Sequence, residues 1–377
     1  MIIATLLEKG RETRVAITPN SAKNYIKAGF AVHIEKNAGV AAGFADKDYE
    51  DIGAHISTAK KQLLSETNIL LCINEPDPQD LSGLPANSLI VGHIENEPES
   101  KLITWCKEQQ ITLLSMNLIP RISRAQSMDS LSSQANLAGY RAVLEASTQF
   151  HRAIPMMMTA AGMIQPAKVL ILGAGVAGLQ AIATAKRLGA VVYAFDVRRA
   201  AKEQVESLGA EFVEVSQEQD SETKGGYAAE TSEEYKKLQA ELIDQYAKLA
   251  DIVISTALIP GRKAPILLHK KTIEQMKPGS VVVDLATSRG GNCEVSTVDE
   301  TIKYGDITIV GLSNMAGLVP TTASELYANN LVHLINLLAS TPTELQFKPE
   351  DEIVQQAVLC HQGHYLPFQE TKEKQNA

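Results

Sequence analysis

A glycine-rich turn between an apolar segment and a helix-like segment most constrains the fold of this chain. Apolar residues at 168–172 and 191–195 predict two strands, and residues 176–188 between them have the pattern of a helix. Asp196 follows the second strand directly. The turn has the spacing GxGxxG, with glycines at Gly173, Gly175 and Gly178. The order strand, glycine turn, helix, strand and acid is typical of a dinucleotide-binding unit.

Each part of this turn has a physical role at a dinucleotide. Gly173 permits the tight turn, Gly175 lets the backbone approach a pyrophosphate, and Gly178 lets the helix pack close to the strand. The helix N-terminus offers unpaired N–H groups and the positive end of its dipole to phosphates. The predicted phosphate-binding residues are therefore Gly173, Ala174, Gly175, Val176 and Gly178. The alternative is a tight turn that binds no ligand.

The residues after the second strand bear on the choice of dinucleotide. The carboxylate of Asp196 can accept hydrogen bonds from both ribose hydroxyls and would repel a 2′-phosphate, which favours NAD(H) over NADP(H). Val197 and Arg198 complete the predicted cofactor segment. Arg198 and Arg199 are residues that can also hold a 2′-phosphate. We favour NAD(H), because the carboxylate of Asp196 would remain beside that phosphate.

Bulk composition excludes several classes of function. The chain has 377 residues, 45% of them apolar, which favours two domains with large cores. A net charge of −9 without a basic cluster argues against nucleic acid and against direct docking on an anionic membrane. No apolar run approaches the ~20 residues of a membrane span, and the start is no signal peptide, so we expect a soluble protein without direct membrane insertion. Neither the four cysteines nor the eight histidines have metal-ligand spacing, so we expect no metal site.

Residues 1–120 predict a second α/β layer structure with a parallel sheet. Its expected strands are residues 31–35, 68–73, 88–94 and 111–116, and Asn20 or Ser21 would cap its first helix. It contains no glycine fingerprint, so nothing in the sequence indicates that this half binds a nucleotide.

The strand and helix pattern continues after the acid. Further strands are expected at 211–215, 251–256, 280–284 and 306–310. Because ligands of such sheets bind beyond the carboxyl ends of the strands, the segment Thr256, Ala257 and Leu258 should border the same crevice. Its small residues suit a flat nicotinamide ring. Plain strand-to-helix turns remain the alternative for these segments.

A long polar segment at 216–231 interrupts this pattern and contains Gly226 and Tyr227. A tyrosine beside glycines can act as a latch on a mobile lid. A disordered surface loop explains the same composition.

A second polar segment, residues 120–136, precedes a long helical pattern. It either borders a cleft or is a solvated connection in which Asp129 or Ser130 caps the helix. We predict an α/β fold of two Rossmann-like doubly wound parallel-sheet domains, joined by long helices with a cleft between. The first domain would comprise residues 1–130 plus 325–377, and the NAD(H)-binding domain residues 131–324. A capping box of Thr322 and Glu325 is expected to start the helix that returns to the first domain.

Several motifs resemble the alanine dehydrogenase and proton-translocating transhydrogenase superfamily. They are residues 14–19 (RVAITP), the glycine turn, residues 256–261 (TALIPG) and residues 284–286 (DLA). Further stretches are similar to the NAD(H)-binding component of transhydrogenase, its alpha subunit or soluble domain I. They are residues 120–136 with 139–141 (GYR), residues 225–227 (GGY) and residues 351–354 (DEIV).

This resemblance implies a function that depends on partners. In the family, the soluble component binds NAD(H) in a cleft between two Rossmann-like domains and forms homodimers. It docks onto an NADP(H)-binding component carried on a membrane proton-channel component. Hydride passes directly between the two nicotinamide rings, coupled to proton translocation. The implied location is cytoplasmic, peripheral on the inner face of the membrane through the partner subunits.

The resemblance also implies roles for particular residues. Arg121, Gln126, Asp129 and Ser132 would line the nicotinamide side, with Gln126 nearest the partner's cofactor. Tyr227, beside Gly226, would close over the bound nucleotide. A methionine that often stands four residues after this tyrosine is replaced here by Thr231.

An alanine dehydrogenase-like amino-acid oxidoreductase is the main alternative. In those enzymes a substrate-binding lysine stands where this chain has Asn74, and an acid stands where it has Ser288. Arg14 and His93 do occupy the positions of their substrate arginine and catalytic histidine. Reductive amination needs a proton donor at the carbonyl, whereas ring-to-ring hydride transfer needs only alignment. A non-catalytic NAD(H)-sensing module would not need the 121–132 residues, and a structural dimerisation subunit would not need an acid at position 196.

Overall fold

The computed structural model describes residues 1–215, 233–258, 262–339 and 341–366. The chain divides into two compact units. Unit 1 comprises Met1–Gln134 and Val319–Ala377, and unit 2 comprises Ala135–Leu318. Each unit is an α/β structure built on a mainly parallel sheet, as the sequence predicted.

The sheet of unit 1 has the order β17-β16-β6-β5-β4-β1-β2-β3. Strands β1 to β6 are parallel and follow the doubly wound order 3-2-1-4-5-6. The antiparallel strands β16 and β17 extend the β6 edge. The bounds are β1 Ile2–Thr5, β2 Ala31–Glu35, β3 His55–Ser57, β4 Ile69–Asn74, β5 Leu89–His93, β6 Thr112–Ser115, β16 Val358–His361 and β17 His364–Tyr365.

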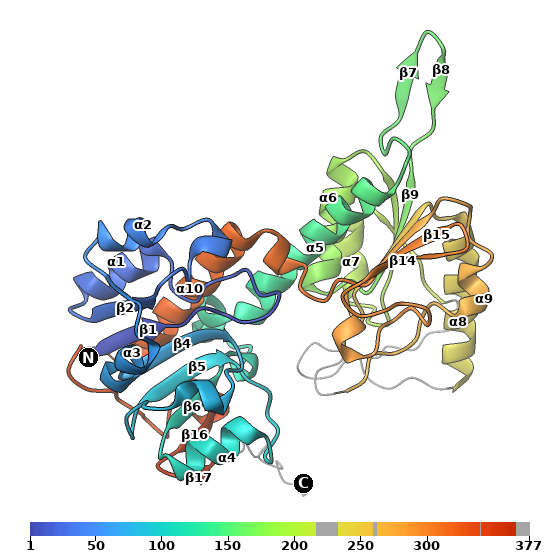
Figure 1. The fold of residues 1–377 in the computed structure, drawn as a ribbon. Coiled ribbons are helices and arrows are strands. Elements are labelled where there is room, and N and C mark those ends of the chain that lie inside the picture. The colour runs from blue at the N-terminus through green and yellow to red at the C-terminus, as the bar shows by residue number, and fades with distance from the viewer. Residues whose placement is uncertain (216–232, 259–261, 340, 367–377) are drawn as a thin grey trace, which may run out of the picture. The chain divides into compact units, whose positions relative to one another are not determined.

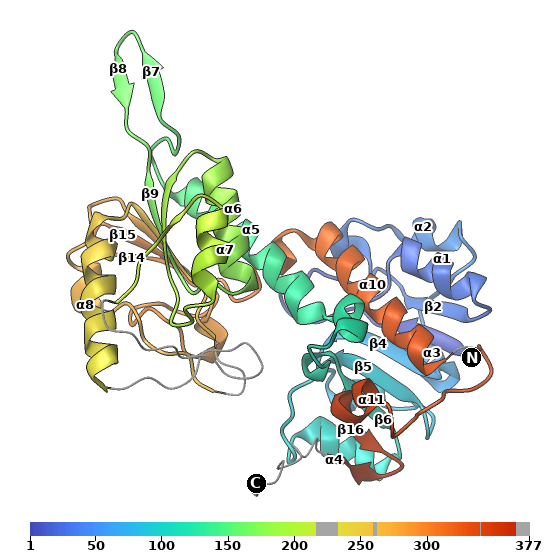
Figure 2. The same ribbon diagram turned by 180° about the vertical axis from the view of Figure 1, so that it is seen from behind.

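Helices cover both faces of this sheet (Figure 2). The helices are α1 Pro19–Lys27, α2 Asp46–Glu50, α3 Lys60–Glu66, α4 Lys101–Glu108, α10 Pro320–Leu338 and α11 Glu352–Ala357. Short 3-10 helices are η1 Val40–Ala42, η2 Pro78–Leu81, η3 Met116–Leu118 and η4 Ser123–Met128. Alternate strand residues pack on α1, α10 and α11 on one face, and on α3 and α4 on the other. This alternation is what a sheet covered on both sides requires.

The sheet of unit 2 has the order β11-β10-β9-β12-β13-β15-β14. All neighbours are parallel except β14, an antiparallel edge strand that the sequence did not predict. The bounds are β9 Lys168–Leu172, β10 Val191–Phe195, β11 Glu211–Phe212, β12 Ile252–Ser255, β13 Val281–Asp284, β14 Thr301–Tyr304 and β15 Ile307–Val310. The order of its parallel strands is again 3-2-1-4-5-6.

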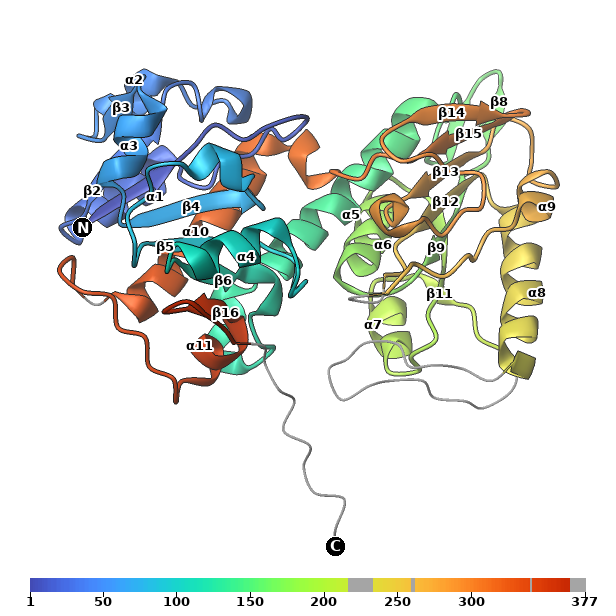
Figure 3. The ribbon, with the colours of Figure 1, turned by 60° about the horizontal axis from the view of Figure 1, so that its bottom comes forward.

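Two groups of helices sandwich this second sheet, as Figures 1 and 3 show. Helices α5, α6 and α7 cover one face, and α8 and α9 cover the other. The bounds are α5 Ser130–Gln149, α6 Val176–Arg187, α7 Ala201–Ser207, α8 Glu233–Leu249 and α9 Lys270–Ile273, with 3-10 helices η5 Thr287–Arg289 and η6 Ala316–Leu318. Between α5 and β9, a hairpin of β7 Met157–Thr159 and β8 Gly162–Ile164 forms a separate two-stranded sheet.

Two predicted helix caps are wrong. Thr18, rather than Asn20 or Ser21, caps α1: its hydroxyl accepts the Ser21 N–H at 3.3 Å, and Pro19 occupies the first helical position. Helix α10 begins at Pro320 after Val319, without a side-chain cap. Thr322 already lies inside that helix, so a capping box with Glu325 cannot form.

Candidate functional site in unit 2

The strand order of unit 2 reverses between β9 and β12, and ligands of such sheets bind beyond the carboxyl ends of the strands at this switch point. The glycine turn follows β9, and the segment Thr256–Leu258 follows β12. The structure therefore brings these two predicted segments to one edge of one sheet. Asp196, after β10, lies at the same edge.

A different physical constraint favours glycine at each of the three positions of the turn. Gly173 has a φ of +96°, which disfavours any side chain. A Cβ on Gly178 would lie 1.8 Å from the carbonyl oxygen of Gly173, so α6 packs directly on the turn. A Cβ on Gly175 would meet only the Nη2 atom of Arg198, at 4.0 Å. Gly175 thus faces open space, and no side chain among the described residues caps the start of α6. This arrangement fits a phosphate group.

Asp196 is buried, and its carboxylate is already hydrogen-bonded. One oxygen accepts the Ala174 N–H at 2.7 Å and the Nη2 of Arg198 at 2.8 Å. The other accepts the backbone N–H of Arg198 at 2.8 Å and its Nε at 2.9 Å. Asp196 thus connects the glycine turn to Arg198, which is also a predicted cofactor residue. Val197, between them, packs at the edge of the core that contains Phe195.

The segment after β12 is bound to the glycine turn. The hydroxyl of Thr256 donates to the carbonyl oxygen of Gly173 at 3.1 Å. Its backbone N–H donates to the carbonyl oxygen of Leu172 at 2.8 Å. The backbone N–H and C=O of Ala257 are both bonded to the side chain of Asn292. Leu258 is exposed. Asn292 was not predicted, because it lies far from position 257 in the sequence and beyond the motif at 284–286.

Two predicted cofactor residues, Gly226 and Tyr227, lie outside the described residues, as does Thr231. Their proposed latch therefore remains a prediction.

Residues of unit 1 with predicted roles

The four residues predicted to line the nicotinamide side lie together on unit 1, between β6 and the start of α5. Arg121 and Gln126 are exposed, and Asp129 and Ser132 are half-buried. Asp129 accepts the Ser132 N–H at 2.9 Å and its hydroxyl at 2.5 Å. Asp129 therefore caps α5, which is the second of the two roles that the sequence allowed for this segment. The exposed Gln126 side chain is available to a partner.

Core packing, an ion pair and hydrogen bonds within unit 1 hold residues 121–132 in place. Ala125 and Met128 are buried in the core of unit 1. Arg124 forms a bidentate ion pair with Asp351 at 2.7 and 2.8 Å, and Asp351 also caps α11. The side chain of Asn330 donates to the Ser127 carbonyl oxygen and accepts the Ser133 hydroxyl, both at 2.8 Å. These anchors, which sequence reasoning missed, hold the exposed residues on a rigid support.

A partly buried polar cluster lies at the switch point of unit 1, beyond β1 and β4. Glu12 binds the guanidinium of Arg14 with both oxygens, at 2.8 and 2.7 Å, and accepts the Asn74 amide at 2.9 Å. Burial alone would raise the pKa of Glu12, but the bonds and charge of Arg14 lower it to about 2. Burial raises the pKa of the neighbouring Glu8 to about 7, while its oxygen accepts the Ile73 N–H at 2.6 Å.

His93 lies at the end of β5, largely enclosed. Its Nε2 is 2.8 Å from the Ser130 hydroxyl, and its ring packs edge-on against Tyr327 at 5.0 Å. Burial, assisted by the positive charge of Arg14, lowers the pKa of His93 to about 3. The imidazole is therefore neutral at physiological pH.

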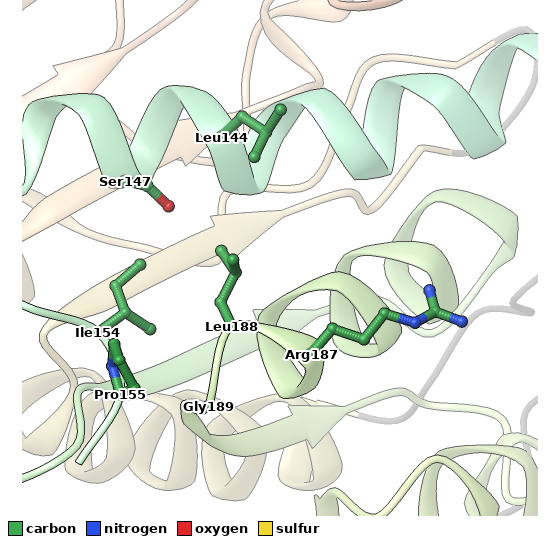
Figure 4. Close-up of a pocket in the computed structure, with 7 residues that line it drawn as sticks. All are labelled: Leu144, Ser147, Ile154, Pro155, Arg187, Leu188 and Gly189. Atoms are coloured by element: carbon green, nitrogen blue, oxygen red, sulfur yellow. The ribbon is translucent and has the colours of Figure 1, made fainter. Parts of the chain in front are cut away.

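A shallow apolar hollow of about 620 Å³ lies elsewhere on unit 2 (Figure 4). It is lined by Leu144, Ser147, Ile154, Pro155, Arg187, Leu188 and Gly189. This hollow adjoins the C-terminal end of α6, whereas the glycine turn adjoins the N-terminal end, about 18 Å away along twelve residues. It is therefore not the crevice of the predicted dinucleotide site.

Within the described ranges, no helix is long and apolar enough to cross a membrane. The same residues contain no group of three or more His, Cys, Asp or Glu side chains placed to hold a metal ion.

Comparison with known proteins covers nearly the whole chain. Residues 6–138 match the family described as alanine dehydrogenase/PNT, N-terminal domain, and residues 142–367 match its C-terminal domain. The first portion of NAD(P) transhydrogenase subunit alpha from Rickettsia prowazekii (strain Madrid E) is 44% identical over 98% of this chain and 97% of that protein. The crystal structure of transhydrogenase from Sinorhizobium meliloti, 40% identical, has a TM-score of 0.85 and covers 97% of this chain and 99% of that one. An L-alanine dehydrogenase structure, 26% identical, has a TM-score of 0.81 and covers 97% of each chain.

Proposed function

Because this chain belongs to the alanine dehydrogenase/PNT family, we propose that it is the NAD(H)-binding component of a proton-translocating transhydrogenase. The 44% identity to a transhydrogenase alpha subunit over 98% of the chain carries this proposal. In it, the chain holds NAD(H) while a partner component presents NADP(H), and hydride transfer between them is coupled to proton translocation. The protein would work at the inner face of the membrane through its partners.

The edge of unit 2 supports the cofactor assignment. Gly175 faces open space at the uncapped start of a twelve-residue helix, which suits a pyrophosphate. Asp196 and Arg198 would meet the adenosine ribose, and Thr256–Leu258 the nicotinamide half. Bound NADH would supply the hydride, and the residues of the chain would orient it.

Three features of unit 1 and unit 2 favour transhydrogenation over reductive amination. The pKa of His93 is about 3, so this histidine is not an imidazolium that can protonate a substrate at neutral pH. Asn74 stands where alanine dehydrogenases have a substrate-binding lysine, and it bonds to Glu12. Ser288 replaces their acid and is exposed.

The polar segment of unit 1 would then serve alignment. Gln126, exposed on its anchored segment, would lie nearest the partner's cofactor. Together with Arg121, Asp129 and Ser132 it would align the two nicotinamide rings, which is the one contribution that direct hydride transfer needs from the protein.

The test mixes this chain with an NADP(H)-binding partner component and follows hydride transfer from NADH to an NADP⁺ analogue. We expect transfer, and in Gln126→Asn a fall of at least about tenfold in rate with unchanged NADH affinity, because misalignment raises the barrier without removing a ligand. Gln62→Asn, an exposed change on α3, should retain the full rate. NAD⁺ reduction by alanine would refute the proposal.

The family resemblance implies a homodimer, and the β7–β8 hairpin offers a candidate dimer interface. Every residue of both strands is exposed, and residues 153–167 contain no charge. Met158 and Met163 form a cross-strand pair and are 79% and 56% exposed. An isolated two-stranded ribbon is marginal in water, and exposed apolar patches mark interfaces. We assign the hairpin to pairing with a second copy of this chain, with the adjoining hollow of Figure 4 as part of the same face.

A further inference from the structure

The strongest unassigned feature of unit 2 is the buried amide of Asn292, which is 0% exposed. All of its hydrogen-bonding capacity is used. The Oδ1 atom accepts the Ser255 hydroxyl at 2.8 Å and the Ala257 N–H at 3.1 Å. The Nδ2 atom donates to the carbonyl oxygens of Ala257 at 2.9 Å and Pro265 at 2.8 Å. One side chain thus binds both backbone groups of a residue in the predicted nicotinamide segment.

Asn292 is itself held by a buried carboxylate at the end of the neighbouring strand. One oxygen of Asp284 accepts the N–H groups of Asn292 and Cys293, both at 2.9 Å, and the Ser296 hydroxyl at 2.7 Å. Gly291 permits this approach, because it has a φ of +81° and a Cβ there would lie 2.8 Å from that oxygen. The position of Asn292 is therefore set from β13.

The network continues to the glycine turn. Thr256 lies between Ser255 and Ala257, two of the three residues that the Asn292 side chain bonds, and its hydroxyl donates to the carbonyl oxygen of Gly173 at 3.1 Å. The loops after β13, β12 and β9 are thus connected through buried and partly buried hydrogen bonds. Such fully satisfied networks fix geometry, because breaking one member leaves buried polar groups unpaired.

From this geometry we propose that Asn292 is a positioning residue for the nicotinamide half of the cofactor, acting through Ala257. The inference rests on the proposed binding of NAD(H) to unit 2. Asp196 and the glycine turn would hold the adenosine half, and none of the four hydrogen bonds of the Asn292 amide is made to either of them; the network reaches the turn only through the hydroxyl of Thr256. Loss of the amide should therefore weaken the binding of the whole dinucleotide and spare that of its adenosine fragment.

The experiment compares NADH and 5′-AMP binding by calorimetry in the full chain. Asn292→Ala should weaken NADH binding by about tenfold, the equivalent of one or two lost hydrogen bonds, and AMP binding by less than about twofold. Ser255→Ala removes one of the four hydrogen bonds and should change the ratio of NADH affinity to AMP affinity by about threefold. This variant provides the test if Asn292→Ala does not fold. Asp251→Asn is the matched control, because this buried acid holds the Lys168 N–H at the opposite end of the sheet. It should lower thermal stability without changing the ratio.

Equal losses of NADH and AMP affinity in the folded Asn292 and Ser255 variants would overturn the proposal, as would unchanged NADH affinity. Both measurements are independent of any partner. A failure of hydride transfer to NADP⁺ would therefore refute the proposed function and leave the role of Asn292 standing.

Discussion

Arg198 holds both carboxylate oxygens of Asp196, with Nε at 2.9 Å from one and Nη2 at 2.8 Å from the other. The acid expected to select NAD(H) is thus paired with the arginine that the sequence offered as a 2′-phosphate ligand. The two opposite charges thus lie side by side where the adenosine ribose would lie. Selectivity must therefore depend on the balance between the two, and each side of the pair can be changed separately.

We predict that Asp196→Asn narrows the preference for NADH over NADPH by about tenfold or more, because the negative charge that repels a 2′-phosphate is then removed. Arg198→Met should widen the preference by a similar factor, since the carboxylate then repels that phosphate unopposed. Fluorescence titration with both nucleotides measures the two ratios. Changes of the same sign in both variants would show that the pair does not contact the ribose.

The glycine turn gives a second prediction, from two alanine substitutions. Gly175→Ala should leave thermal stability within about 0.5 kcal/mol, because its Cβ would enter open space, yet should weaken NADH binding at least about tenfold by occupying phosphate space. Gly178→Ala should lose stability as well, because its Cβ would overlap the Gly173 carbonyl at 1.8 Å. Calorimetry and thermal unfolding separate the two effects. Full NADH affinity in Gly175→Ala would mean that this turn binds no phosphate.

Glu8 gives a prediction about pH. Its pKa is about 7 in the folded protein against an ordinary value of 4.5, so the folded state binds this proton more tightly than the unfolded state does. Its effect on stability is therefore absent below about pH 4.5, becomes steadily more unfavourable between about pH 4.5 and 7, and is fully unfavourable above about pH 7. Glu8→Gln should raise the free energy of unfolding of unit 1 by about 1–3 kcal/mol at about pH 8 and change it little at about pH 4.5.

Fluorescence of Trp105, the single tryptophan and a residue of α4, reports the denaturant unfolding of unit 1. Glu50→Gln removes an exposed carboxylate and serves as the control, with no comparable gain at alkaline pH. A uniform effect of Glu8→Gln at both pH values would contradict the assignment of a raised pKa.

The hairpin gives a prediction about assembly. Met158→Asp places a charge on the most exposed large apolar side chain of the ribbon and should convert a dimer to a monomer at micromolar concentration, measured by sedimentation velocity. Val298→Asp introduces the same charge at an exposed apolar residue elsewhere on unit 2 and should leave the dimer intact. A persistent dimer in Met158→Asp would assign the dimer interface to another surface. Binding of the wild-type chain to lipid vesicles would instead assign the hairpin to a membrane.

Local sequence signals predicted a large share of both sheets. Strand β2 occupies 31–35 as expected, and the strands and helix around the glycine turn follow from apolar periodicity and glycine spacing alone. These features depend on residues close together in the chain. The motifs that predicted the two Rossmann-like units and the family are also contiguous in the chain. The family matches and the structural match confirm both predictions.

Features that depend on distant partners were not predicted. Strand β16 exists because Val358 and Cys360 pair with Leu114 and Leu113 of β6 in antiparallel register, and no local pattern reveals this pairing. The exposure of the apolar residues in the β7–β8 hairpin was not predicted, because composition does not say what covers a side chain. Asn292 bonds to backbone groups of Ala257 and Pro265, which only the folded chain brings near it.

The division of the chain into units has a consequence for its biosynthesis. Unit 2 is one uninterrupted stretch, whereas unit 1 needs residues from both ends of the chain. The core of unit 1 includes Tyr327 and Leu331 of α10, and the amino group of Met1 donates to the carbonyl oxygen of Pro342 at 2.7 Å. On the ribosome, unit 2 can therefore close while the earlier segments of unit 1 still expose apolar strands. Residues 1–134 are therefore made before unit 2 but completed after it, and chaperones have access to them throughout that interval.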